Sequence, residues 1–548
     1  MHISTTTSGK GHRALVAAVT PSAELSGVEL EVFRHALAGV AEEMGVALRR
    51  AAYSPNIKER ADCSAAVFDP DGEMVAQAEH IPVHLGAMPA SVRAVLDTYG
   101  ELRPGQQVCV NDPYLGGTHL PDLTIVAAVG PEEGSEDGTG LLGYVANRAH
   151  HADVGGAAPG SMPATATDIA MEGLRIPPIL IADADGERDD VVRLIAANSR
   201  TPGERRGDLR AQFAANHVGA RRLREIAGRM GAARLREAMA AVCDYSDRRV
   251  RAAVADIPDG CYRNCDVLEI GAGVTIRAAV TVAGDEVTID FDGTDPQVPV
   301  NLNAVFAVTL SSAMFVFRML TDPDAPPNAG CYRCLHVRAP EGSVVHATFP
   351  APVAAGNVET SQRIVDVLLG AFAQAIPERV PAASQGTMNN LLIGAGGDCN
   401  NFGPFSYYET LGGGEGGTPD RPGMSGVHTG MTNTRNTPAE AMELDYPLRV
   451  WRYELRSSSG GTGRHPGGDG LIREVEVLTD CTLTVQSERR EHPPWGLGGG
   501  GAGAVGRNIL RRADGTEVAL PSKGTWQLHR GDRVRIETPG GGGWGAAL

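Results

Sequence analysis

Imidazole and carboxylate side chains gather in two glycine-flanked segments in the first third of the chain. The first segment, Gly-Gly-Thr-His-Leu-Pro-Asp, contains His119 and Asp122, and the second, His-His-Ala-Asp-Val-Gly-Gly, contains His150, His151 and Asp153. Imidazole and carboxylate ligands without thiolates suit Zn²⁺, Mn²⁺ or Fe²⁺. The residue types therefore indicate a site for one divalent metal. The alternative is a buried polar network or a surface turn.

The segments around these residues predict how they meet. Residues 108–130 read as a strand, a glycine-rich turn and a second strand, and residues 141–151 read as a further strand that ends on two histidines. A hairpin between the last two strands would place both polar segments at the same end of a sheet. We therefore expect the following side chains to converge on one point: His119, Asp122, His150, His151 and Asp153.

Further candidate site residues precede the first segment in the sequence. Asp62 precedes an apolar strand and is either a cap or another ligand. His80 and His84 flank Pro82, which favours an extended segment in which both imidazoles point the same way. They are candidates for substrate contacts, with ordinary polar turn residues as the alternative.

A later stretch, residues 411–436, is rich in glycine, asparagine and threonine and offers many neutral hydrogen-bond donors. Its candidate substrate-binding residues are His428, Asn433 and Arg435. They could bind the carbonyl groups of a substrate or a phosphate. A loop that contacts another subunit is the equally weighted alternative.

Composition narrows the function classes. The 548 residues include 49 Lys and Arg against 66 Asp and Glu, giving a net charge of −17, which argues against nucleic-acid binding. The sequence shows no apolar run long enough for a membrane span, no signal peptide and no phosphate-binding loop. We therefore expect a cytoplasmic chain that does not bind ATP by itself.

The elements that must position these residues belong to an α+β fold, with mixed helical and antiparallel-sheet domains and long glycine-rich loops. Helical periodicity covers residues 27–53, 86–100 and much of 187–256, and strand alternation dominates after residue 258. We predict a disordered lead-in over 1–25, a metal-site domain over 26–257 and a β-rich domain over 258–548. Two cysteine pairs, Cys261 with Cys265 and Cys331 with Cys334, leave a structural zinc site as a minor alternative to scattered thiols.

Long motifs resemble the hydantoinase B/oxoprolinase family from about residue 25 to the C-terminus. They are NIKERADCSAAVFDPDGEMVAQAEHIPVHLGAMPASV, NDPYLGGTHLPDLTIV, NRAHHADVGG, GNVETSQRIVDVLLGA, QGTMNN, GVHTGMTNTRNTPAEAMELDYPLRVWRYELRSSSGGTGRHPGGDGLIREVE and GDRVRIETPGGGGWG. The family includes B subunits of ATP-dependent N-methylhydantoinases, the C-terminal half of 5-oxoprolinase and alpha-type subunits of acetone and acetophenone carboxylases.

This resemblance implies a metal-containing subunit whose A-type partner binds ATP and phosphorylates the substrate. The family's metal ligands match Asp62, His119, Asp122 and His150 here. His151 and Asp153 remain alternative ligands or residues that support the ligands. Either could also take the proton from a metal-bound water that attacks the substrate. The implied activity is hydrolysis of a cyclic amide such as a hydantoin or 5-oxoproline.

Two other functions stay open, a ketone carboxylase subunit and a non-catalytic scaffold. In each case we expect a hetero-oligomer with the A-type chain. Trp544, near the end of a glycine-rich tail that is expected to be flexible, is a candidate anchor in a partner's pocket.

Overall fold

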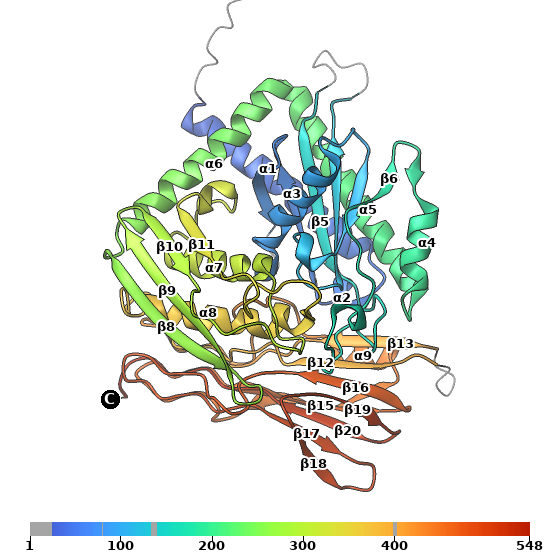
Figure 1. Ribbon diagram of the computed structural model, residues 1–548, viewed down its shortest axis with the longest axis vertical. Coiled ribbons are helices and arrows are strands. Elements are labelled where there is room, and N and C mark those ends of the chain that lie inside the picture. The colour runs from blue at the N-terminus through green and yellow to red at the C-terminus, as the bar shows by residue number, and fades with distance from the viewer. Residues whose placement is uncertain (1–24, 79–80, 133–139, 398–402, 548) are drawn as a thin grey trace, which may run out of the picture.

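The computed structural model describes residues 25–78, 81–132, 140–397 and 403–547. Within these ranges the chain forms several open sheets, mostly antiparallel, with helices packed on them (Figure 1). The predicted α+β class is therefore confirmed. Residues 1–24 of the predicted lead-in lie outside the described residues.

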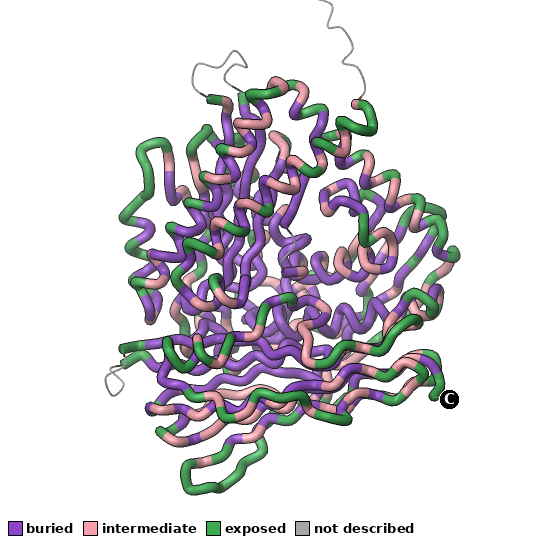
Figure 2. The backbone as a smooth tube through the Cα atoms, turned by 180° about the vertical axis from the view of Figure 1, so that it is seen from behind, coloured by how far each residue is buried: buried purple, intermediate pink, exposed green. Residues whose placement is uncertain are grey.

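A seven-stranded antiparallel sheet dominates the N-terminal half, with the order β2-β1-β5-β4-β3-β6-β7. Its strands are β1 (Cys63–Phe68), β2 (Met74–Ala78), β3 (Gln107–Val110), β4 (Asp122–Val129), β5 (Gly143–His150), β6 (Ile179–Asp183) and β7 (Gly186–Glu187). All residues of β1, β4 and β5 are buried. Both faces of the sheet are therefore covered, and its centre is continuously buried in Figure 2.

Successive residues of β1 point to opposite faces of the sheet, and different helices cover the two faces. Ala65 and Val67 pack in one cluster with α1 (Gly27–Ala51) and α5 (Pro202–Met230), and α6 (Ala232–Val254) joins them. Ala66 and Phe68 pack on the other face with α3 (Ala87–Tyr99). The helix predicted from residue 27 begins as expected, because Ser26 and Glu29 form a capping box. Two short helices, α2 (Pro55–Lys58) and α4 (Asp189–Ala197), complete this part.

The middle of the chain adds a second sheet and two buried helices. The sheet has the order β11-β10-β9-β8, with β8 (Gly260–Leu268), β9 (Val274–Ala283), β10 (Glu286–Asp290) and β11 (Leu335–Arg338). Helices α7 (Phe306–Leu320) and α8 (Ser361–Phe372) lie against it, and a π-helical turn over Gly356–Thr360 precedes α8. One hydrophobic cluster runs from Ile81 to Met431 and so includes residues from both sides of the predicted boundary near 257.

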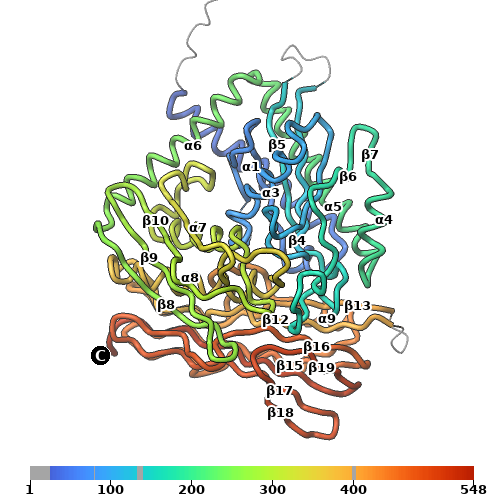
Figure 3. Tube along the Cα trace, in the orientation of Figure 1, coloured from blue at the N-terminus to red at the C-terminus, as the bar shows by residue number. Residues whose placement is uncertain are grey.

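Two further sheets pack together at the C-terminal end, in the lower layers of Figure 3. One has the order β13-β12-β16-β19, with β12 (Asn390–Ala395), β13 (Phe405–Glu409), β16 (Cys481–Gln486) and β19 (Lys523–Leu528). The other has the order β14-β15-β20-β17-β18, with β14 (Leu448–Arg456), β15 (Gly470–Val477), β17 (Arg507–Arg511), β18 (Glu517–Leu520) and β20 (Arg533–Glu537). A short helix, α9 (Ala439–Asp445), leads into β14.

The glycine-rich segments pack closely against one another, and the C-terminal segment does not form the expected flexible tail. Their backbones hydrogen-bond to one another; for example, the Gly414 amide donates to Pro539 O at 3.0 Å and the Gly541 amide to Gly468 O at 2.9 Å. A Cβ on Gly414 would lie 2.0 Å from Gly468 O, so only glycine allows this approach. The tail folds back on its own chain, where the Trp544 amide donates to His465 O at 2.8 Å.

The two cysteine pairs lie at different edges of one sheet. Cys261 and Cys265 are exposed on the edge strand β8, whereas Cys331 and Cys334 are buried next to β11 at the other edge. No group of three or more metal-ligating side chains in the described part of the chain includes any of them. The described helices also include none that is long and apolar enough to cross a membrane.

Candidate metal centre

The hairpin of β4 and β5 brings the two polar segments together as predicted. Asp122, the first residue of β4, is the register partner of His150, the last residue of β5. His119 lies on the turn before β4, which is closed by a hydrogen bond from the Asp122 amide to His119 O at 3.1 Å. Three side chains from the two segments therefore meet at one end of the sheet.

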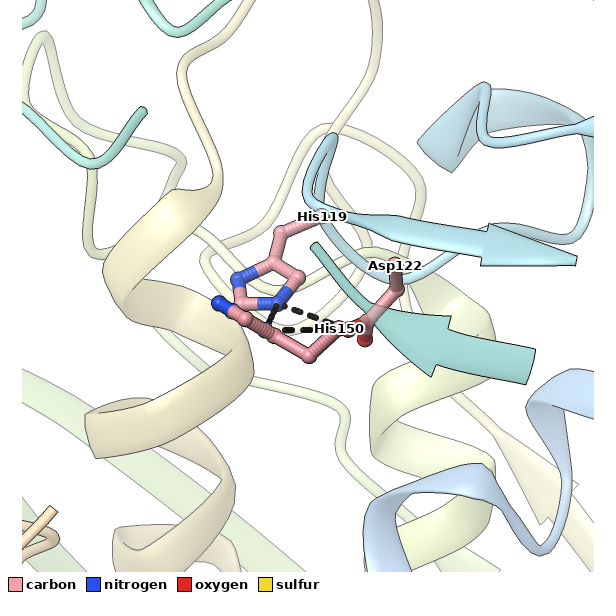
Figure 4. Close-up of side chains that lie close together, drawn as sticks. All are labelled: His119, Asp122 and His150. Carbon is pink, nitrogen blue, oxygen red and sulfur yellow. Dashed lines mark hydrogen bonds and ion pairs between the residues drawn. The ribbon is translucent and has the colours of Figure 1, made fainter. Parts of the chain in front are cut away.

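The three side chains point toward one another (Figure 4). His119 Nε2 lies 3.1 Å from His150 Nδ1, and Asp122 Oδ1 lies 3.2 Å from the first nitrogen and 3.1 Å from the second. None of the three residues exposes more than 2% of its surface. They form the only group of three or more potential ligands of this kind among the described residues.

The neighbouring histidines keep the carboxylate of Asp122 ionised. Burial alone would raise the pKa of Asp122, but the charge of His119 and hydrogen bonds with His119, His150 and His84 hold that pKa well below its usual value. Burial lowers the pKa of His150, which favours its neutral imidazole. An ionised carboxylate and a neutral imidazole are the forms that bind a metal.

The donor set fits a divalent metal on two structural grounds. His119 Nδ1 lies 3.3 Å from Ala354 O, which leaves Nε2 to face the cluster. His150 turns its Nδ1 toward the same point, 3.1 Å from Asp122 Oδ1. Two imidazoles and one carboxylate with ligand atoms within 4.8 Å of one another match the nitrogen and oxygen donors that Zn²⁺, Mn²⁺ and Fe²⁺ accept.

Asp62 and His84 line the same small cavity as the three clustered residues. Asp62 immediately precedes β1, and Cys63 of that strand pairs with Ala149, so the fold places Asp62 beside the end of β5. His84 Nε2 lies 3.6 Å from Asp122 Oδ2, and its Nδ1 lies 2.8 Å from the Ser64 hydroxyl.

The extended segment expected around Pro82 is not formed. Pro82 instead begins a 3₁₀ turn over Pro82–His84, because a proline is well suited to the first position of a helical turn. His80 lies outside the described residues.

His151 and Asp153 lie in other surroundings. His151 follows His150 and faces α5, where its Nε2 lies 3.0 Å from Gln212 Oε1. Asp153 pairs with Arg200 at 2.9 Å and also accepts hydrogen bonds from backbone amides. The structure therefore does not bring these two side chains into the cluster.

A larger cavity of about 640 Å³ adjoins the small one, and Ile81 and Thr432 line both. His428 and Asn433 line the larger cavity, whereas Arg435 is exposed and lines neither. His428 lies 3.0 Å from Asn436 through its Nε2. Burial, together with the charge of Arg60, lowers the pKa of His428 to about 4. It therefore offers a neutral imidazole.

Several residues around the cluster were not found from the sequence. The ring of Tyr408 stacks on His150 at 4.8 Å between ring centres. The buried side chain of Arg60 donates to Tyr408 O at 2.9 Å and lies 4.9 Å from the centre of the Tyr408 ring. Glu172 accepts hydrogen bonds from the amides of Val353 and Ala354 and so fixes the peptide that contacts His119. Because these residues come from distant segments, no local pattern links them to the two histidine-containing segments.

Comparison with known families matches residues 26–547 to the hydantoinase B/oxoprolinase family, and the chain belongs to that family. It is 39% identical to 5-oxoprolinase 1 of Arabidopsis thaliana over 548 aligned residues, which cover 95% of this chain and 42% of that protein. It is 31% identical to a putative D-/L-hydantoinase B subunit of Pseudomonas sp. (strain NS671), covering 96% of this chain and 91% of that protein. The chain therefore spans less than half of the plant protein.

Two solved structures share the fold. An ATP-dependent caprolactamase from Pseudomonas jessenii matches with a TM-score of 0.87 and 29% identity, covering 95% of this chain and 91% of that chain. A nucleotide-free acetone carboxylase matches with a TM-score of 0.85, covering 94% of this chain and 75% of that chain, but at 19% identity it shows the fold alone. The three of these relatives above 25% identity are thus named as a 5-oxoprolinase, a putative hydantoinase subunit and an ATP-dependent caprolactamase.

Proposed function

We propose that the chain is the metal-containing B-type subunit of an ATP-dependent hydrolase of cyclic amides, of the hydantoin or 5-oxoproline type. The observation on which this rests is the buried group of His119, Asp122 and His150 beside a cavity of about 640 Å³. The relatives named as 5-oxoprolinase, hydantoinase and caprolactamase support hydrolysis of an amide over the other reactions.

Four residues would hold the metal. Asp62, which lines the same cavity, would complete the set formed by His119, Asp122 and His150. When bound, a divalent metal acts as a Lewis acid that polarises carbonyl groups and lowers the pKa of water. The hydroxyl of Thr118 donates a hydrogen bond to Asp122 Oδ2 and would hold this carboxylate in position to bind the metal.

The other residues would orient the substrate. The small cavity, at about 20 Å³, is too small for a cyclic amide, so we assign the ring to the larger cavity with its reacting carbonyl toward the shared wall at Thr432. The neutral imidazole of His428 and the amide of Asn433 would hydrogen-bond its polar groups. His84, beside Asp122, would contact the reacting end.

An A-type partner chain would supply the other half of the reaction. Resonance protects an amide from water, and phosphorylation of its carbonyl oxygen removes that protection. The sequence contains no phosphate-binding loop, so ATP would be bound by the partner. The bacterial hydantoinase relative is itself named as a B subunit, which supports an assembly of two kinds of chain.

The test compares two neighbouring histidines. We expect His119→Ala to lose bound metal and the ATP-dependent hydrolysis that the wild-type chain shows with its A-type partner. His151→Ala is the matched control, because His151 faces Gln212, and it should keep its metal. Equal metal content in wild type and His119→Ala would overturn the metal assignment.

The substrate is tested in the same assembled complex. Cyclic amides should be hydrolysed with ATP consumption. Bicarbonate-dependent ATP consumption with a ketone would instead establish a carboxylase. Full activity of a complex that contains His119→Ala would instead indicate that the chain is a non-catalytic scaffold.

A further inference from the structure

A buried glutamate lies behind the metal centre and outside the proposed ligand set. Glu359 is fully buried in the π-helical turn Gly356–Thr360, whose residues Asn357 and Val358 line the small cavity. It makes no ion pair with any described residue, and its Oε2 is buried without a hydrogen-bond partner there. Its Oε1 accepts hydrogen bonds from the Met388 amide at 3.1 Å and from Asn390 Nδ2. A buried carboxyl without an ionic partner is nevertheless costly, and π-helical turns often occur at functional sites.

A continuous chain of contacts leads from this carboxyl to the cluster. Glu359 Oε1 accepts a hydrogen bond from Asn390 Nδ2 at 2.8 Å, and Asn390 Oδ1 accepts one from the Tyr408 hydroxyl at 2.9 Å. The Tyr408 ring then stacks on His150, with an angle of 23° between the rings.

We propose that Glu359 is a positioning residue for the metal centre, which acts on His150 through Asn390 and Tyr408. The proposal rests on the proposed metal-dependent function. The orientation of a ligating histidine is normally fixed by a hydrogen bond from its second nitrogen, and His150 Nε2 has no such partner among the described residues. The stacked Tyr408 ring takes over that task, and the hydrogen bond from its hydroxyl keeps the ring in place.

Glu359 is suited to this role as a neutral acid. Burial, reinforced by the negative charge of Glu488, raises its pKa to about 8. The charged or titratable groups that face it are Glu488, Lys523, Arg490 and Tyr408. Lys523 is paired with Glu488, so it does not neutralise Glu359. Glutamine therefore reproduces both the shape and the charge of this side chain near pH 7.

The experiment measures the Mn²⁺ dissociation constant of the full chain by calorimetric titration at pH 7. Glu359→Gln should bind within twofold of wild type, because its amide oxygen still accepts from Asn390. Glu359→Ala and Tyr408→Phe should each bind about 10-fold to 100-fold more weakly, as expected for lost outer support of a ligand. Combining these two changes should add little, because both interrupt the same chain of contacts.

A buried glutamate outside this chain of contacts is the control. Glu269 accepts hydrogen bonds from the amides of Arg490, Glu491 and His492 and has no contact with Asn390 or Tyr408. Glu269→Ala should reduce stability and leave Mn²⁺ affinity unchanged.

Two outcomes would overturn the positioning role of Glu359 alone. One is wild-type affinity in Glu359→Ala, and the other is an equal loss in Glu359→Gln and Glu359→Ala. Absence of Mn²⁺ binding by the wild-type chain would overturn the metal centre itself, and this proposal with it.

Discussion

Replacing Asp153 separates a structural role from a catalytic one. The carboxylate is fully buried and accepts hydrogen bonds from the amides of Gly155, Gly160 and Arg200, at 3.0, 3.2 and 3.0 Å. The Arg200 guanidinium adds an ion pair at 2.9 Å. Asp153 therefore holds the loop after β5 to the segment before α5, and we expect Asp153→Ala to damage the fold rather than the chemistry.

The expected loss follows from the contacts. Removing one partner of a buried ion pair costs about 3–5 kcal/mol of unfolding free energy, and stranded backbone amides contribute to that figure. The side chain of Arg200 is 22% exposed and can be rehydrated once its partner is removed. The loss of unfolding free energy in Asp153→Ala should therefore lie toward the lower end of that range. Arg200→Ala should cost less, about 1.5–3 kcal/mol, because the three amides keep their acceptor.

Urea unfolding of both variants, together with metal analysis and turnover in the assembled complex, tests this expectation. Each folded molecule of Asp153→Ala should keep its metal and its turnover number. If Asp153→Ala unfolds like wild type but has lost turnover, Asp153 acts in the reaction and the structural reasoning is wrong.

Three further outcomes are expected. Because the pKa of His428 falls to about 4 on folding, from 6.5, the folded chain binds fewer protons than the unfolded chain between these values. His428 alone should therefore lower stability by about 2 kcal/mol from pH 7 to pH 5, and His428→Gln should remove that part of the slope in urea unfolding. Gly414→Ala should lower the melting temperature by several degrees, because its Cβ would meet Gly468 O, whereas Gly39→Ala, with open space around it, should not. Deleting residues 538–548 should also lower the melting temperature of the isolated chain, because the tail packs on its own fold; an unchanged value would show that the tail serves a partner instead.

Local sequence patterns are sufficient to predict the hairpin and three members of the cluster. The strand at residues 141–151 and the strand that begins at Asp122 can be paired because antiparallel neighbours need only a short connection. The pattern does not say which of His150 and His151 faces inward. Adjacent strand residues point to opposite faces of the sheet, but which of the two histidines faces the cluster depends on what covers each face. Here Gln212 of α5 contacts His151.

The glycine-rich tail differs from its prediction for a related reason. Glycine in a loop predicts mobility, since it costs the most conformational entropy to order. In the folded chain its missing side chain instead lets backbones approach and hydrogen-bond, as between Gly414 and Pro539. That use of glycine becomes visible only when the neighbouring segment is known.

The surroundings of the proposed metal centre explain why a local motif is an incomplete description of it. The two histidine-containing segments would supply the ligand atoms, but Ala354, whose carbonyl faces His119, lies 235 residues along the chain from it. The ring against His150 belongs to Tyr408 of β13, and its hydroxyl donates to Asn390 of β12 the hydrogen bond that holds the ring in place. One buried cluster joins residues from Ile81 to Met431, so the late segments are fixed relative to the N-terminal sheet by shared packing. The orientation of the ligands is therefore a property of the whole fold, and a hairpin cut out of this chain should keep the residue types of the site without its geometry.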